Sequence, residues 1–155
     1  MLLFVLVSTA QCFASDRYMW IVSDDLTTFS FDTQTIKFSK KYDGSIDYST
    51  IEVWIKNDYS DEGKNRVKDR YNDVKDIDKF SYKLSKNRYN IQTHQILFLA
   101  EFLYDERGIV LYNYKDKYPQ WEDVIPGSYG EVIELAVGLY SNNKTNRYYM
   151  EQRSK

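Results

Sequence analysis

The feature that most constrains the fold is a helix-start signal in the stretch WEDVIPGSYGEVIELAVGL, which begins at Trp121. Pro126 and Gly127 end an incoming extended segment. Ser128 and Glu131 stand at the spacing of a capping box, in which the hydroxyl accepts the N–H of Glu131 and the carboxylate accepts the N–H of Ser128. We therefore predict that a helix begins here and that these five residues form a structural helix-start motif.

The predicted helix carries a broad apolar stripe. Its apolar residues recur at helical spacing, and they are Val132, Ile133, Ala136, Val137, Leu139 and Tyr140. A stripe of this width must be buried against a large surface. Because most of the preceding sequence has the patterns of β-strands, we expect the helix to cover a sheet.

Alternation of apolar and polar residues predicts the strands of that sheet. The clearest alternation runs through residues 51–56, IEVWIK, after the hairpin signal Asp43-Gly44. It indicates one face in the core and one partly wet face. Further strands are predicted at residues 18–22, 29–31, 36–38 and 82–84.

A second hairpin is predicted later in the chain. The apolar run Ile96–Leu103 fits either a buried helix or a central strand covered on both faces. The residues after it decide for a strand, because Asp105 to Gly108 has the composition of a type I turn with glycine last. We predict strands at residues 93–104 and 109–114, with Asp105 and Gly108 as structural turn residues.

Two polar segments complete the predicted domain. Residues 60–75 are charged almost throughout and carry only Val67, Tyr71 and Val74 at helical spacing, which predicts an exposed amphipathic helix. The aspartates near its end lack the glycine and the terminal glutamate of a calcium loop, so no metal site is predicted. Residues 141–155 form a polar C-terminal tail, for which we expect a frayed end or a short edge element.

The N-terminus predicts export. Residues 1–14, MLLFVLVSTAQCFA, carry no charge and have the form of a signal peptide cleaved after its last alanine. Two alternatives stay open: Leu2–Val7 is a buried strand, or Cys12 is lipidated, although Gln11 is larger than that processing prefers. The apolar run is too short to span a membrane. The predicted domain then spans residues 15–140 and contains no cysteine, so no disulfide can form.

Charge and composition narrow the classes of partner. The chain carries 21 Lys and Arg interspersed with 23 Asp and Glu, a net charge of -2, so it has no general field that attracts nucleic acid. Aromatic residues make up 17% and include 15 tyrosines. This content favours sheet packing, and exposed tyrosines also suit contacts with proteins or sugars.

No catalytic or metal-binding constellation is recognisable. His94 is the single histidine and has no cysteine partner, and Ser128 stands in G-S-Y-G rather than in a nucleophile elbow. Asp24 and Asp25 lie in a predicted turn, and the six glycines are too scattered for a phosphate loop. We predict a protein that is not an enzyme and has no cofactor, and we keep an unrecognised enzyme that uses His94 or Ser128 as a third hypothesis.

Three stretches together resemble the surface-adhesin protein E family of bacterial exported proteins. They are the early W-I-V-S-x-D with the aromatic F-S-F-D-T-x-T-I, the strand ending Y-D-x-x-G, and W-x-x-I/V-x-P-G-S-x-G-E. In this chain they occupy Trp20–Asp24 with Phe29–Ile36, Tyr104–Gly108, and Trp121–Glu131. The resemblance implies an α+β fold, with a single curved antiparallel sheet of about six strands and a C-terminal helix on its concave face.

The resemblance also implies a function and one departure from the family. It implies homodimers and binding of host extracellular-matrix and plasma proteins. The family ties helix to sheet with a disulfide, but this chain has Tyr89, Asn90 and Ile91 in the first region and Val137 and Gly138 in the second. We therefore expect the helix to dock by packing alone.

Two non-enzymatic hypotheses follow. The leading one is an exported binding module at the cell surface or in the periplasm, acting as an adhesin. The alternative is a periplasmic domain that binds a small ligand or carbohydrate through tyrosines and Trp54 on an open sheet face. A contiguous aromatic patch on the outer face of the sheet would be the most informative observation.

Overall fold

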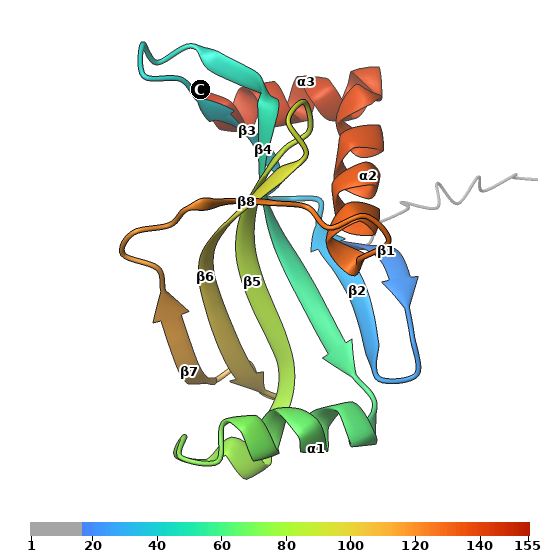
Figure 1. The fold of residues 1–155 in the computed structure, drawn as a ribbon, viewed down its shortest axis with the longest axis vertical. Coiled ribbons are helices and arrows are strands. Elements are labelled where there is room, and N and C mark those ends of the chain that lie inside the picture. Colours follow the sequence, from blue (N-terminus) through green and yellow to red (C-terminus); the bar gives the residue numbers. More distant parts are fainter. Residues whose placement is uncertain (1–16) are drawn as a thin grey trace, which may run out of the picture.

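The computed structural model describes residues 17–155 and shows one open antiparallel sheet with three α-helices (Figure 1). The predicted signal peptide and Cys12 lie outside the described residues. In chain order the elements are β1 (Tyr18–Ser23), β2 (Thr27–Asp32), β3 (Lys37–Lys40), β4 (Ile46–Tyr59), α1 (Asp61–Arg70), a 3-10 turn (Ile77–Lys79), β5 (Phe80–Asn90), β6 (Gln95–Asp105), β7 (Val110–Lys115), β8 (Trp121–Asp123), α2 (Tyr129–Asn142) and α3 (Lys144–Ser154).

The sheet confirms the predicted α+β class. Six strands run in the order β1-β2-β4-β5-β6-β7, while β3 pairs with β4 and β8 pairs with β6. The long strand β4 holds the sheet together, because it pairs with β2 and β3 at different levels and with β5 along its length. Irregularities between β1 and β2, β3 and β4, β5 and β6, and β6 and β7 bend the strands.

The core lies between one face of the sheet and the C-terminal helices. The predicted alternation in β4 is confirmed, because Ile51, Val53 and Ile55 are fully buried. The same core cluster includes Ile21, Phe31, Phe38 and Tyr89 from other strands, Ile36 from the turn before β3, Ile133 and Val137 from α2, and Met150 from α3. We call this side of the sheet the core face.

Helix α2 buries a narrower stripe than the sequence predicts. Ile133 and Val137 are buried, but Val132 is exposed and Leu139 is 72% exposed. The helix contacts the sheet along one side only, and the buried arc includes a polar residue, Glu134. The Glu134 carboxylate pairs with His94, as described below.

The predicted frayed tail is wrong, because most of residues 141–155 form helix α3 docked on β3. The Asn143 side chain caps the helix by accepting backbone N–H groups of Thr145 and Asn146. At the other end, Arg153 Nη1 donates to the carbonyl of Ile36 at 3.0 Å. The Ser154 hydroxyl also donates to a β3 carbonyl. Besides the buried Met150, polar side chains thus hold this helix on the backbone carbonyls of Ile36 and Phe38, which apolar periodicity does not reveal.

The helix-start motif forms with one change from the predicted capping box. Ser128 Oγ accepts the N–H of Glu131 at 3.4 Å, as expected. The Glu131 carboxylate, however, accepts the N–H of Gly127 at 2.8 Å, while the N–H of Ser128 donates to Ile125. Gly127 has a φ of 74°, a left-handed conformation that glycine adopts without steric strain. Trp121 lies in β8, paired with Leu97.

The predicted turn at the end of β6 is confirmed. The Asp105 carboxylate accepts the backbone N–H groups of Arg107 and Ile109 at 2.9 and 2.8 Å, and Gly108 has a φ of 79°. The charged helix α1 also forms, although it ends at Arg70, before the predicted end. No helix within residues 17–155 has both the length and the apolar character to span a membrane.

Candidate functional site

The most distinctive surface is the side of the sheet opposite the core face, which we call the outer face. Helices α2 and α3 pack on the core face and α1 lies across one end of the sheet, so none of the described helices covers the outer face (Figure 1). Strand register places Trp54 opposite Lys86, Leu84 opposite Phe102 and Tyr82 opposite Tyr104. The outer face therefore carries a contiguous row of half-buried aromatic and aliphatic side chains, which are Tyr18, Trp54, Tyr82, Leu84, Phe102 and Tyr104.

The rings of this row pack on one another. Tyr82 and Tyr104 are stacked, with centroids 4.9 Å apart and planes within 6°. Phe102 lies 6.3 Å from Tyr104 and 5.7 Å from Trp54. Tyr82 and Tyr104 therefore cover one face of each other, whereas Trp54 is tilted to Phe102 by 57° and does not stack on it.

Lys56 connects two sides of the row. Its Nζ lies 5.3 Å from the centre of the Tyr18 ring and 5.1 Å from that of Tyr82, and it also pairs with Asp58 at 2.7 Å. A cation held between two rings is attracted by both. Burial raises the pKa of Tyr82 above its ordinary value, so its hydroxyl stays protonated at neutral pH.

A cluster of charges borders the row. The Glu52 side chain is only 7% exposed, and its carboxylate contacts Lys86 at 2.8 Å, Arg88 at 2.9 Å and Lys37 at 3.6 Å. Burial by itself would raise the pKa of Glu52, but the hydrogen bonds and charges of Lys86 and Arg88 outweigh it and hold this pKa below its ordinary value. Three cations around one carboxylate leave this end of the outer face positively charged.

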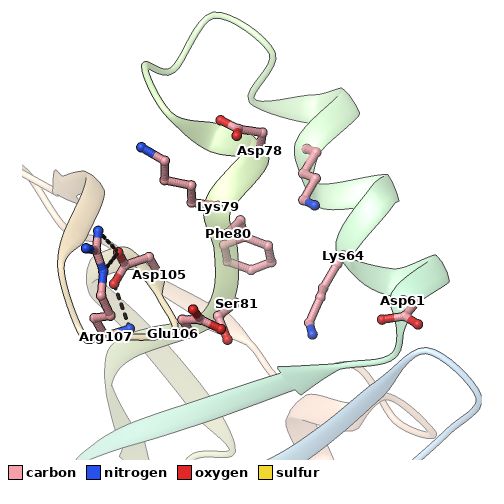
Figure 2. Close-up of a pocket in the computed structure, with 10 residues that line it drawn as sticks. Asp61, Lys64, Asp78, Lys79, Phe80, Ser81, Asp105, Glu106 and Arg107 are labelled. Carbon is pink, nitrogen blue, oxygen red and sulfur yellow. Dashed lines mark hydrogen bonds and ion pairs between the residues drawn. The ribbon is translucent and has the colours of Figure 1, made fainter.

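A groove of about 640 Å³ lies elsewhere, between α1 and the turn after β6 (Figure 2). Figure 2 shows Lys64 of α1 and Glu106 of the turn on different sides of Phe80. Arg107 forms an ion pair with Asp105, since its Nη2 lies 3.0 Å from the Asp105 carboxylate. The lining mixes charges of both signs and contains no cysteine or histidine, so we assign the groove no chemistry.

The two residues of the enzyme hypothesis are not brought together. Ser128 caps α2, whereas His94 Nδ1 lies 2.9 Å from Oε1 of Glu134. The His94 ring is exposed and the Glu134 carboxylate is buried, so the pair joins the turn before β6 to helix α2. In the sequence, Glu134 lies between the apolar residues Ile133 and Val137. That position is the sequence signal that could have indicated a buried carboxylate with a partner. Within residues 17–155, no group of three or more candidate ligands can hold a metal ion.

Neither a comparison with protein-family models nor one with curated proteins finds a match to this chain. The resemblance to the protein E family therefore stays a prediction that depends on its three motifs. The fold and the outer face are the observations from which function has to be inferred.

Proposed function

We propose that this chain is an exported, non-enzymatic binding module that contacts a protein partner through the outer face of its sheet. The observation that carries this proposal is the contiguous row of half-buried aromatic side chains, bordered by cations, on a sheet face that no helix within residues 17–155 covers. Tyrosine, tryptophan and arginine are the residues most enriched where protein interfaces concentrate their binding energy.

The packing of the rings favours a protein partner over a carbohydrate. Aromatic platforms that bind rings present an open face, but Tyr82 and Tyr104 cover each other and Lys56 lies against Tyr82. The row combines apolar rings with the polar hydroxyl groups of its tyrosines, a mixture suited to the varied surface of a protein. The small-ligand or carbohydrate hypothesis is therefore the alternative outcome of the experiment.

The family resemblance supports the setting of this activity. An adhesin of this kind is exported to the cell surface or periplasm and binds host extracellular-matrix or plasma proteins. A reporter fused behind residues 1–20 tests export directly, and we expect it to leave the cytoplasm. A reporter that stays entirely cytosolic would contradict the exported setting without affecting the assignment of the outer face.

Binding to immobilised plasma and matrix proteins tests the outer face itself. We expect Trp54→Ala and Arg88→Ala each to weaken binding about tenfold, because each removes a large side chain of the outer face. Leu139→Ala is the matched control, since Leu139 is exposed on α2, away from the outer face, and should leave binding unchanged. A thermal melt of each variant separates lost contact from lost folding.

Two results would count against the proposal. Retention on a glycan array, without binding to any plasma or matrix protein, would support the carbohydrate alternative. Binding that Leu139→Ala weakens as much as Trp54→Ala would place the interface outside the outer face.

A further inference from the structure

Strand β1 is an edge strand of the sheet, and within residues 17–155 it pairs only with β2. The N–H of Thr33 donates to the carbonyl of Arg17 at 2.8 Å, which fixes the phase of the hydrogen bonds between the two strands. In an antiparallel pair the bonded residues alternate, so the next bonded position is Met19, opposite Phe31. The N–H and C=O groups of Tyr18 and Trp20 consequently point away from the sheet.

A groove of about 820 Å³ lies beside this free edge, between β1 and helices α2 and α3. Its walls are largely apolar and aromatic, and they are formed by Tyr18, Met19, Trp20, Tyr140 and Tyr149 with Thr33, Gln34 and Asn146. Trp20 is 64% exposed and Met19 is 44% exposed. Large apolar side chains are thus accessible on both sides of a strand edge whose N–H and C=O groups point away from the sheet.

Arg153 is the single charged residue among those that line the groove. One of its five N–H groups donates to the carbonyl of Ile36 at 3.0 Å, which fixes the guanidinium in place. Within the described residues it makes no ion pair with an acidic side chain. The groove therefore has a net positive charge that an occupant with one carboxylate would neutralise.

From the free edge, the apolar groove and the single cation together, we propose that β1 accepts an extended polypeptide segment of a partner protein as an added strand. The segment pairs its backbone with Tyr18 and Trp20, lays apolar side chains against Met19 and Tyr149, and places an acidic side chain near Arg153. The irregularity between Trp20 and Val22 turns the edge away, so the paired stretch is short. The site borders the outer face at Tyr18, but its occupant pairs with the edge of β1 rather than with the aromatic row.

A display library of short linear peptides, selected on the full chain, is the probe for this site. We expect it to enrich peptides with alternating apolar residues and an acidic residue. Trp20→Pro should weaken an enriched peptide about tenfold, because proline removes the outward N–H and its ring blocks the added strand. Trp20→Val is the matched control, since it also removes the indole but keeps the N–H, and it should bind at least about fivefold better than Trp20→Pro.

Hydrogen exchange gives a second readout that does not depend on a variant. On addition of an enriched peptide, the amides of Tyr18 and Trp20 should exchange more slowly, whereas that of Met19, already bonded to β2, should change little. Arg153→Gln should remove the preference for acidic peptides. The exchange pattern distinguishes backbone pairing from simple apolar contact, and Arg153→Gln tests the charge contact.

Several outcomes would overturn the proposal. No enrichment of alternating peptides, or equal binding by Trp20→Pro and Trp20→Val, would exclude strand addition. A dimer of the chain that Trp20→Pro converts to a monomer would assign the edge to a second copy. Binding that appears only after residues 1–16 are removed would assign it to the chain's own N-terminal segment.

Discussion

The two faces of strand β4 achieve burial in different ways. On the core face, Ile51, Val53 and Ile55 are covered by other strands and by helices α2 and α3. On the outer face Glu52 is only 5% exposed, although no described helix lies over it. Its burial comes from long side chains of its own face, above all Lys86 and Arg88. A sheet face can therefore be ordered without a covering layer.

The comparison separates stability from binding. Burial of apolar surface contributes about 1.5–3 kcal/mol for each large core side chain. Partly exposed ion pairs and cation–π contacts contribute about 0–1 kcal/mol each, and salt weakens the ion pairs. We expect the core face to determine whether the chain folds. Substitutions on the outer face should lower the free energy of unfolding only a little, so its side chains can serve in binding a partner.

The largest expected effect tests the coverage of the core face. Val137→Asp places an unpaired carboxylate in a fully buried position of α2, and it should lower the free energy of unfolding by about 4 kcal/mol or prevent folding. Leu139→Asp makes a similar change at an exposed position of the same helix and should stay within about 0.5 kcal/mol of the parent chain. Denaturant titration measures both. Similar effects from the two substitutions would refute the docking of α2.

An intermediate effect tests the charge cluster of the outer face. Because the pKa of Glu52 is lowered in the folded chain, its contribution to stability is present above the unfolded pKa of about 4.3 and is lost as the pH falls through the folded pKa. Glu52→Gln should cost about 1–2 kcal/mol at neutral pH, since the three cations stay partly solvated. It should also flatten the acid dependence of the free energy of unfolding.

Glu106→Gln is the control for that experiment, because Glu106 is exposed in the turn after β6. Its acid dependence should match that of the parent chain. If Glu52→Gln and the parent chain lose stability equally between neutral pH and pH of about 4, Glu52 does not hold the cluster together.

The smallest effect tests the start of α2. Ser128→Ala removes the hydroxyl that accepts the N–H of Glu131 and should lower the free energy of unfolding by about 1 kcal/mol. Ser128→Gly should cost only a few tenths of that unit, because glycine is tolerated at this helix position. Thermal unfolding of both variants measures the difference. A larger loss from glycine than from alanine would contradict the capping role.

Local signals were sufficient to predict much of the fold. The alternation through residues 51–56, the Asp43-Gly44 turn and the Asp105 to Gly108 turn depend on residues close in sequence, and the structure confirms all three. Helix α3 escaped prediction because Arg153 and Ser154 dock it on backbone carbonyls of residues far away in the chain. No local pattern distinguishes such side chains from those of a polar tail.

The candidate site was predictable only in kind. The tyrosine content and the position of Trp54 indicated aromatic side chains on an open face. That Lys56 contacts both Tyr18 and Tyr82 depends on the order of β1, β2, β4 and β5 and on their register. A change of one residue in that register would turn each of these side chains to the core face.

The contact between His94 and Glu134 bears on how the C-terminal helices detach from the sheet. It joins α2 to the turn before β6 through one contact between side chains. Beside it, a Cβ atom added at Gly138 would have a methyl group of Ile91 as its nearest neighbour. No covalent bond spans this junction within the described residues, which contain no cysteine. We expect the two C-terminal helices to detach as one cooperative unit, at a lower free energy than global unfolding, while the long strands remain paired.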